Sequence, residues 1–288
     1  MKLLILGAQG MLGQALFSQF NAVGGNQVIG YDKDDLDVTD RERVSLVFDS
    51  IQPTHVLNAV AINAVDAIET SSELYQVAET INGVIPGDLA KLCRQKGITF
   101  IHYSSDYVFS GNNGRGYHEC DRIEPVNTYG TTKAHGETLV QEHGDQYYII
   151  RLSKLFGKPA TSAGAKKSFV DTMLSLVLEG GKTSLDIVDE EKSSPTYAPD
   201  LADFTHRLLI GDYPFGIYHG ANHGVCTWYD WAKEIFAYKG ISVQVNPVPG
   251  SKYPRPAKRP QFSELINTKL PAQRSWQEGL GEYLKICG

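Results

Sequence analysis

Short apolar runs recur along the first half of the chain, separated by longer stretches in which apolar residues return at helical spacing. The runs span residues 2–7, 27–31, 54–61, 98–103 and 147–152, and one helical region extends from about 66 to 95. A nearly continuous apolar run of this length is typical of a strand buried on both faces of a parallel sheet. Strands that alternate with helices predict an α/β protein with a doubly wound parallel sheet. Ligands of such sheets bind at the carboxyl ends of the strands.

Three glycines follow the first apolar run at intervals of three residues. Gly7, Gly10 and Gly13 stand between that run and a stretch with helical spacing at 14–20. In such a turn, the first glycine permits the sharp bend, the second lets a pyrophosphate approach the backbone, and the third lets the helix lie close to the strand. The N–H groups at the helix start then bind the anion. The alternative is a tight turn that binds no ligand, but the place of the triplet between a strand and a helix favours dinucleotide binding.

An acidic residue, Asp32, ends the second apolar run, about 20 positions after these glycines. It is expected to bind the hydroxyls of the adenosine ribose. Its charge would repel a 2′-phosphate and favour NAD, while Lys33 beside it weakens that preference. We therefore expect NADPH or NADH as the cofactor. The alternative for Asp32 is that it is an ordinary loop aspartate without a ligand.

The fourth apolar run leads into Ser104, Ser105, Asp106 and Tyr107, and a Tyr129-x-x-x-Lys133 pair follows. Side chains four residues apart lie on the same face of a helix, so the lysine ammonium is expected beside the phenol. A neighbouring cation lowers a phenol pKa that is ordinarily about 10. Such a phenol can exchange a proton with a substrate oxygen, to which a serine hydroxyl can also hydrogen-bond. A surface tyrosine over a solvated lysine is the alternative, but the position after a buried strand favours catalysis.

The alternation weakens beyond Leu155, where helical stretches at 168–178, 200–210 and 227–239 are separated by short strands and turns. We predict a dinucleotide-binding domain at 1–155 and, at 156–288, mainly a smaller substrate-binding lobe from which some segments return to the sheet. Four cations, Lys252, Arg255, Lys258 and Arg259, stand among prolines without a counter-charge nearby in the sequence. They form either a solvated face or a site for a substrate pyrophosphate, with Arg259 as the strongest candidate.

Composition narrows the function classes. The 288 residues carry a formal net charge of −6, which argues against a nucleic-acid-binding surface, and no apolar run approaches the length of a membrane span. The four cysteines are scattered without a Cys-x-x-Cys pair, as expected for reduced thiols in a cytoplasmic enzyme. No resident metal is expected. A metal at a subunit contact is an alternative, with oxygen ligands from Asp189, Glu190 and Glu191. A homodimer is the default expectation for a soluble enzyme.

Several motifs together resemble the extended short-chain dehydrogenase/reductases and, more narrowly, the dTDP-4-dehydrorhamnose reductase family. The broader resemblance rests on the glycine triplet, on Tyr103 to Phe109 and on Tyr129-x-x-x-Lys133 with Glu137. The narrower one adds, from end to end of the chain, Leu36-Asp37-Val38-Thr39-Asp40, Asn58-Ala59, Val65-Asp66, Glu69, Glu119, Pro125 before Asn127-x-Tyr129-Gly130, Pro195-Thr196 and Arg259-Pro260-x-x-Ser263-x-Leu265.

The resemblance implies a Rossmann-type fold and hydride transfer from NAD(P)H to C4 of a dTDP-linked 4-keto-6-deoxysugar, giving dTDP-L-rhamnose. It implies Tyr129 as the general acid, Lys133 as its activator and ribose ligand, and Ser105 as the hydroxyl that orients the ketone. The implied cofactor-binding residues are Gly7, Gly10, Met11, Leu12, Gly13, Asp32, Asp37, Ala59, Ala61, Tyr129 and Lys133. The implied substrate-binding residues are Ser104, Asp106, Tyr107 and Arg259.

The chain departs from the family pattern at the residues expected to face the sugar. Lys154 stands where the family usually has tryptophan, Ile62-Asn63 replaces Tyr-Thr, and Glu191 to Ser194 replaces a Gln-x-Gly segment. A cation and an aromatic ring offer a pocket different contacts, so reductase chemistry is better supported than the exact sugar. The alternatives are an epimerase or dehydratase of the same superfamily, or a non-catalytic regulatory subunit that binds the dinucleotide.

Overall fold

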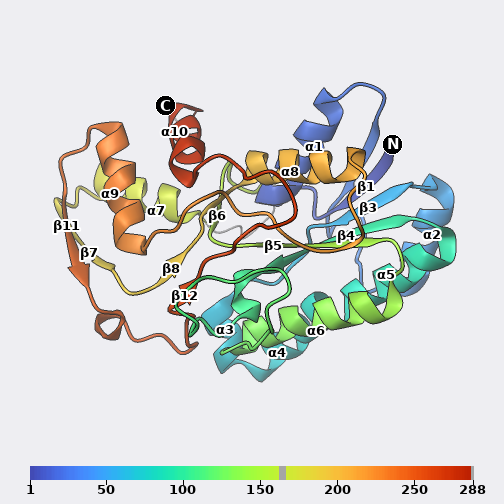
Figure 1. The fold of residues 1–288 in the computed structure, drawn as a ribbon, viewed down its shortest axis with the longest axis horizontal. Coiled ribbons are helices and arrows are strands. Elements are labelled where there is room, and N and C mark those ends of the chain that lie inside the picture. Colours follow the sequence, from blue (N-terminus) through green and yellow to red (C-terminus); the bar gives the residue numbers. More distant parts are fainter. Residues whose placement is uncertain (162–166, 287–288) are drawn as a thin grey trace.

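Six parallel strands form the central sheet of the computed structural model, which describes residues 1–161 and 167–286 (Figure 1). The strand order is β10-β5-β4-β3-β1-β2, so the direction of winding reverses between β1 and β3. This order confirms the predicted doubly wound sheet, and the reversal marks the edge at which such sheets bind ligands. The strands are β1 (Lys2–Leu6), β2 (Gln27–Tyr31), β3 (His55–Asn58), β4 (Thr99–Ser105), β5 (Tyr147–Leu152) and β10 (Gly216–His219).

Helices cover both faces of this sheet. Alternate residues of β1 serve different cores: Leu3 and Ile5 pack toward α1 (Met11–Ala22) and α8 (Ala198–Ile210), whereas Leu4 and Leu6 pack on the opposite side. That opposite face is covered by α2 (Arg41–Ile51), α5 (Ile85–Lys96) and α6 (Thr128–His143). In Figure 1, α1 and α8 lie above the sheet and α5 and α6 below it. Burial on both faces explains why the strand is apolar from Leu3 to Leu6.

The C-terminal half contributes to the sheet and also builds a second body. β10 pairs with β5, and α8 packs against α1. A separate core, centred on Phe156 and Trp231, lies among helices and short strand pairs at the other end of the molecule (Figure 1). The division at residue 155 stays a prediction. The remaining elements are α7 (Phe169–Leu178), α9 (Trp228–Lys239), α10 (Trp276–Ile286), β6 (Leu155–Phe156), β7 (Ser184–Val188), β8 (Lys192–Ser193), β9 (Thr196–Tyr197), β11 (Gln244–Val248), β12 (Phe262–Ser263) and the 3-10 turns η2 (Asp106–Val108) and η3 (Gly250–Lys252).

The helical region predicted at 66–95 is interrupted. It comprises α3 (Val65–Thr70), α4 (Ser72–Ala78), a π-helical turn η1 (Glu79–Val84) and α5. Within the π turn, the buried Asn82 side chain bonds both the N–H and the carbonyl of Ile62, each at 2.9 Å. The turn therefore ties the helix to the loop that follows β3. No helix in the described part of the chain is both long and apolar enough to span a bilayer.

Candidate active site

A cavity of about 670 Å³ opens beyond the carboxyl ends of β1, β2 and β3. The strand predicted at 54–61 ends already at Asn58, and the small residues that follow form part of the cavity wall. Six of the predicted cofactor residues line it: Gly7, Gly10, Asp32, Asp37, Ala59 and Ala61. Met11, Leu12, Gly13, Tyr129 and Lys133 are not among its lining residues.

The opposite wall of this cavity was missed by the sequence analysis. It comes from α4 and η1, through Glu73, Gln76, Val77 and Thr80. Their spacing of three or four residues places them on one helical face, which is a signal that the sequence did contain. The sequence could not show that this face turns toward the glycine turn, because that depends on how α4 packs against the sheet.

The glycine turn has the geometry that dinucleotide binding needs. Gly7 has φ +80°, in the left-handed region that only glycine enters at little cost. A Cβ at Gly13 would lie 2.1 Å from the Gly7 carbonyl oxygen and 2.7 Å from Cα of Ala8, so only glycine lets α1 approach β1 this closely. Gly10 is the N-cap of α1 and provides no side-chain cap. The N–H groups of the first turn are therefore available to an anion.

Two of the acidic residues that line the cavity, Asp32 and Asp37, are held by backbone N–H groups. Asp32 accepts from the backbone N–H of Gln9 (2.9 Å) and of Lys33 (2.8 Å), which ties the end of β2 to the glycine turn. Asp37 accepts from the N–H (2.9 Å) and hydroxyl (2.7 Å) of Thr39, and these bonds lower its pKa. Each carboxylate oxygen has two lone pairs, so both residues can still accept bonds from ribose hydroxyls.

The end of β4 is a buried polar cluster. The Ser105 hydroxyl donates to Asp106 (3.1 Å) and accepts from the N–H of Tyr107 (3.2 Å). The other Asp106 oxygen accepts from Ser263 of β12 (2.6 Å), and burial raises the pKa of this carboxyl. Asp106 thus positions Ser105, and its predicted contact with the substrate stays a prediction. The Ser104 hydroxyl is buried and has no hydrogen-bond partner among the described residues.

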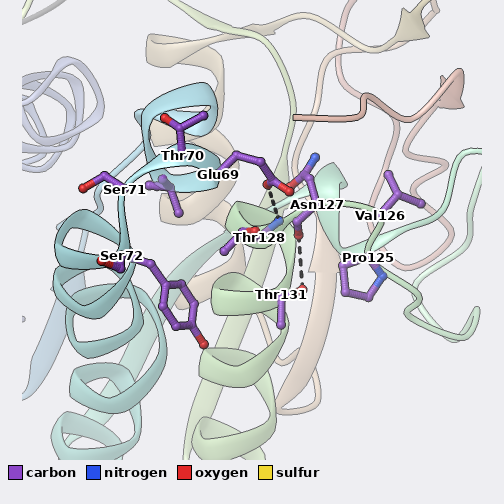
Figure 2. A pocket seen from close by; sticks show the side chains of 11 residues that line it. Glu69, Thr70, Ser71, Ser72, Pro125, Val126, Asn127, Thr128 and Thr131 are labelled. Carbon is purple, nitrogen blue, oxygen red and sulfur yellow. Dashed lines mark hydrogen bonds between the residues drawn. The ribbon is translucent and has the colours of Figure 1, made fainter. Parts of the chain in front are cut away.

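The start of α6 brings Tyr129 against Tyr107 of η2, the turn that directly follows Ser105. Asn127 caps the helix by accepting from the N–H of Gly130 (2.8 Å), and Glu69 of α3 accepts from the N–H of Thr128 (2.9 Å). Figure 2 shows Glu69 reaching across to this first turn, beside an open depression of about 700 Å³ between α3, α4 and α6. A Cβ at Gly130 would lie 2.2 Å from the Tyr107 carbonyl oxygen, so the start of α6 lies directly against η2.

The protonation of Tyr129 differs from the sequence-based expectation. Burial raises the pKa of its phenol to about 12, while a hydrogen bond with Ser105 acts in the opposite direction. The Tyr107 ring lies edge-on to it, with centroids 5.6 Å apart. The predicted lowering of this pKa by Lys133 is therefore wrong for the ligand-free chain, because removal from water outweighs the local polar contacts.

Lys133 is buried on α6, one helical turn after Tyr129. Its Nζ donates to the carbonyl of Tyr103 (2.7 Å) and lies 3.5 Å from Nε2 of His102. Burial lowers the lysine pKa to about 8, against the opposing effect of the Glu137 carboxylate. Amine and ammonium are thus both accessible near neutral pH.

Three of the four cations near the C-terminus have acidic partners, so the expectation of cations without counter-charge is wrong. Arg259 pairs with Asp66 (2.7 Å), Lys252 pairs with Asp186 (2.6 Å), and Arg255 pairs with Glu191. These partners are distant in sequence, and only the fold brings them together. The Arg259 side chain is 11% exposed and also donates to the Ala257 carbonyl (2.7 Å), so it is fixed in place.

Residues 1–287 match the family model described as RmlD substrate binding domain. The dTDP-4-dehydrorhamnose reductase of Escherichia coli (strain K12) is 34% identical over 99% of this chain and 97% of its own. The chain belongs to the dTDP-4-dehydrorhamnose reductase family.

Solved structures of this family superpose over almost the whole chain. A dTDP-4-dehydrorhamnose reductase from Clostridium acetobutylicum has a TM-score of 0.91 and 35% identity, covering 100% of this chain and 99% of that one. The reductase from Bacillus anthracis, solved in complex with NADP, has a TM-score of 0.91 and 31% identity, covering 99% of both chains. The predicted Rossmann-type fold is confirmed.

The main departure from the family pattern, Lys154, is accommodated by a different aromatic residue. Its backbone has φ +43°, and its Nζ lies 4.1 Å from the ring centre of Trp228, a cation–π contact. The same ammonium donates to the carbonyls of Glu191 (3.4 Å) and Cys226 (3.2 Å). The Trp228 indole N–H in turn donates to the Glu191 carboxylate (2.9 Å). Lysine and tryptophan thus form one rigid unit in this member of the family.

Proposed function

We propose that this chain is an NAD(P)H-dependent oxidoreductase that reduces the C4 ketone of dTDP-4-dehydro-L-rhamnose to dTDP-L-rhamnose. Membership of the family and the NADP found in the Bacillus anthracis structure support this activity and a nicotinamide dinucleotide as its cofactor. The observation that carries the proposal is that Ser105 and Tyr129 both lie against Tyr107 at the carboxyl end of β4: the Ser105 hydroxyl accepts from the Tyr107 N–H (3.2 Å), and the ring centres of Tyr129 and Tyr107 are 5.6 Å apart. The dinucleotide cavity opens on the same edge of the sheet. A homodimer and a cytoplasmic location stay predictions.

The proposed roles follow from the chemistry of each side chain. A bound nicotinamide supplies the hydride to C4. Tyr129 donates its phenolic proton to the ketone oxygen, and its raised pKa of about 12 keeps that proton in place at neutral pH until it is needed. The Ser105 hydroxyl donates to Asp106 in this structure, and turns its single hydrogen to the same ketone oxygen when the substrate binds. Tyr129 then recovers a proton from solvent.

The proposed substrate contacts surround this pair. Tyr107 lies beside the Tyr129 ring, and Ser104 has a buried hydroxyl without a partner in the described chain. Arg259 is the candidate for the substrate diphosphate, because a guanidinium matches phosphate oxygens in a two-point contact. Asp66 holds this guanidinium in position before the substrate binds.

The direct test is oxidation of NADH and of NADPH in the presence of dTDP-4-dehydro-L-rhamnose, for the wild type and for Tyr129→Phe. We expect the variant to lose about 10²- to 10⁴-fold in kcat with little change in dinucleotide affinity. Tyr238→Phe, at a tyrosine that is 44% exposed, is the matched control and should retain full activity.

The other outcomes are informative. Turnover of a different nucleotide ketosugar alone would change the substrate and keep the reaction class. One dinucleotide retained per purified chain would favour an epimerase or dehydratase. A binding subunit without catalysis would be unaffected by Tyr129→Phe.

A further inference from the structure

The buried His102 on β4 lies between two hydrogen-bonding groups, Asn58 and Lys133. Its Nδ1 lies 3.3 Å from Nδ2 of Asn58, and its Nε2 lies 3.5 Å from Nζ of Lys133. All three side chains are at most 1% exposed. Burial and the charge of Lys133 hold the pKa of His102 well below its ordinary value, so the imidazole is neutral and carries one hydrogen.

The orientation of Asn58 decides which ring nitrogen carries that hydrogen. Its Oδ1 accepts from the backbone N–H of Val60 (3.2 Å), so its Nδ2 donates toward Nδ1 of His102. Nδ1 is then the acceptor, and the ring hydrogen lies on Nε2, facing Lys133. An ammonium on Lys133 has only donors, so two donors would face each other without solvent between them.

Reversing the Asn58 amide does not remove the conflict. It would let Nδ1 of His102 donate to Oδ1, but Nδ2 would then face the N–H of Val60, which cannot give up its hydrogen. In the first arrangement the conflict disappears when Lys133 loses a proton, because a neutral amine can accept from Nε2–H and still donate to the Tyr103 carbonyl, 2.7 Å away. The 3.5 Å separation is long for a hydrogen bond, as expected where an ammonium faces an N–H.

A second buried histidine shows the contrasting case. His219 also lies beside a cation, with its Nε2 3.4 Å from NH1 of Arg151. Its Nδ1 lies 3.1 Å from the carbonyl of Ile266, so Nδ1 carries the hydrogen and Nε2 is free to accept from the guanidinium. Every donor there meets an acceptor, and the cation stays charged.

We propose that His102 is a positioning residue whose Nε2–H faces Nζ of Lys133 and favours the neutral amine of this lysine over its ammonium. Two other effects act on Lys133. Burial disfavours the ammonium, whereas the carboxylate of Glu137, one turn further along α6 and paired with Arg151, favours it. His102 thus adds a directional contact that makes the Lys133 ammonium release its proton more readily, so that Lys133 can pass to Tyr129 a proton that is then replaced from solvent. This role in catalysis rests on the proposed function.

The test is a direct titration of Lys133. Protein labelled with [ε-13C]lysine is titrated by NMR without ligands, with the Lys133 signal assigned from its loss in Lys133→Met. In the wild type we expect a midpoint near pH 8. His102→Phe keeps an aromatic ring but removes the N–H, and should raise the midpoint by about one unit. His219→Phe, the same change at the satisfied histidine, should leave it in place.

The proposal is overturned if Lys133 titrates in the wild type near the ordinary lysine value of about 10.4. It is also overturned if His102→Phe leaves the midpoint unchanged. Should that variant not fold, His102→Gln replaces it, because its amide can turn an oxygen toward the ammonium and should raise the midpoint as well. The titration reports a proton and not turnover, so His102 can fail this test while the reductase activity stands.

Discussion

A Gly→Ala substitution within a helix usually stabilises a protein. At Gly13 we expect the opposite, because α1 lies against β1 at this position. Gly13→Ala places a Cβ 2.1 Å from the Gly7 carbonyl oxygen and 2.7 and 2.9 Å from backbone atoms of Ala8. None of these is a flexible side chain, so the helix must move away from the strand. Overpacking of this kind costs up to about 3 kcal/mol. Alanine in a helix interior recovers about 1 kcal/mol relative to glycine.

The expected net effect is therefore a loss of about 2 kcal/mol in the free energy of unfolding, where an unobstructed Gly→Ala change in a helix would stabilise. Urea unfolding followed by circular dichroism measures it. Gly10→Ala is the matched control, because its Cβ meets only the Gly7 oxygen, at 3.1 Å, and its φ of −64° suits any residue. A Gly13→Ala protein as stable as the wild type, or more stable, would refute the close approach of α1 to β1. Weaker dinucleotide binding should accompany the loss, since the turn between Gly7 and Gly13 shapes the anion site.

Further predictions concern buried charge, pH and the substrate. Glu137→Gln leaves Arg151 buried without its partner, so urea unfolding should show a loss of about 3–5 kcal/mol. Burial lowers the pKa of His55 to about 4, below its value in the unfolded chain. The unfolded chain therefore binds a proton that the folded chain does not, and stability falls as the pH drops from about 6.5 to 4. Thermal melts of His55→Gln over this range should show a shallower fall in melting temperature. Arg259→Met should raise KM for the nucleotide sugar at least about tenfold without changing dinucleotide affinity, which fluorescence titration measures, whereas an unchanged KM would exclude a phosphate contact.

The parts of the site that sequence alone predicted correctly are local. Gly7, Gly10 and Asp32 line the cavity as expected, because a strand, a tight turn and a helix in succession fix where such residues lie. The approach of Gly13 to the strand also follows from local geometry.

The meeting of Ser105 and Tyr129 depends on more than local sequence. Twenty-odd residues separate them, and the packing of Gly130 on the Tyr107 carbonyl brings the start of α6 to the end of β4. The resemblance to a known family predicted that Ser105 and Tyr129 act together. The hydrophobic periodicity alone placed Ser105 at the end of a strand and Tyr129 at the start of a helix.

What could not be predicted depends on distant partners and on burial. The acids that neutralise Arg255 and Arg259 lie 64 and 193 positions away, so no window of sequence reveals them. The direction of the Tyr129 pKa was missed for a related reason. Spacing on a helix indicates a neighbouring charge, but the depth at which the phenol is buried follows from the complete fold.

The position of β10 at the edge of the sheet bears on how this protein is made. Its residues 216–219 pair with β5, and α8 shares with α1 the cover of one face of β1. During synthesis, the nucleotide-binding half therefore leaves the ribosome with the β5 edge of its sheet unpaired and one apolar face covered only in part, by α1, until residue 219 has followed. A nascent chain stalled shortly after residue 155 should accordingly be held by chaperones or be open to proteases, and should become resistant only once residue 219 has emerged.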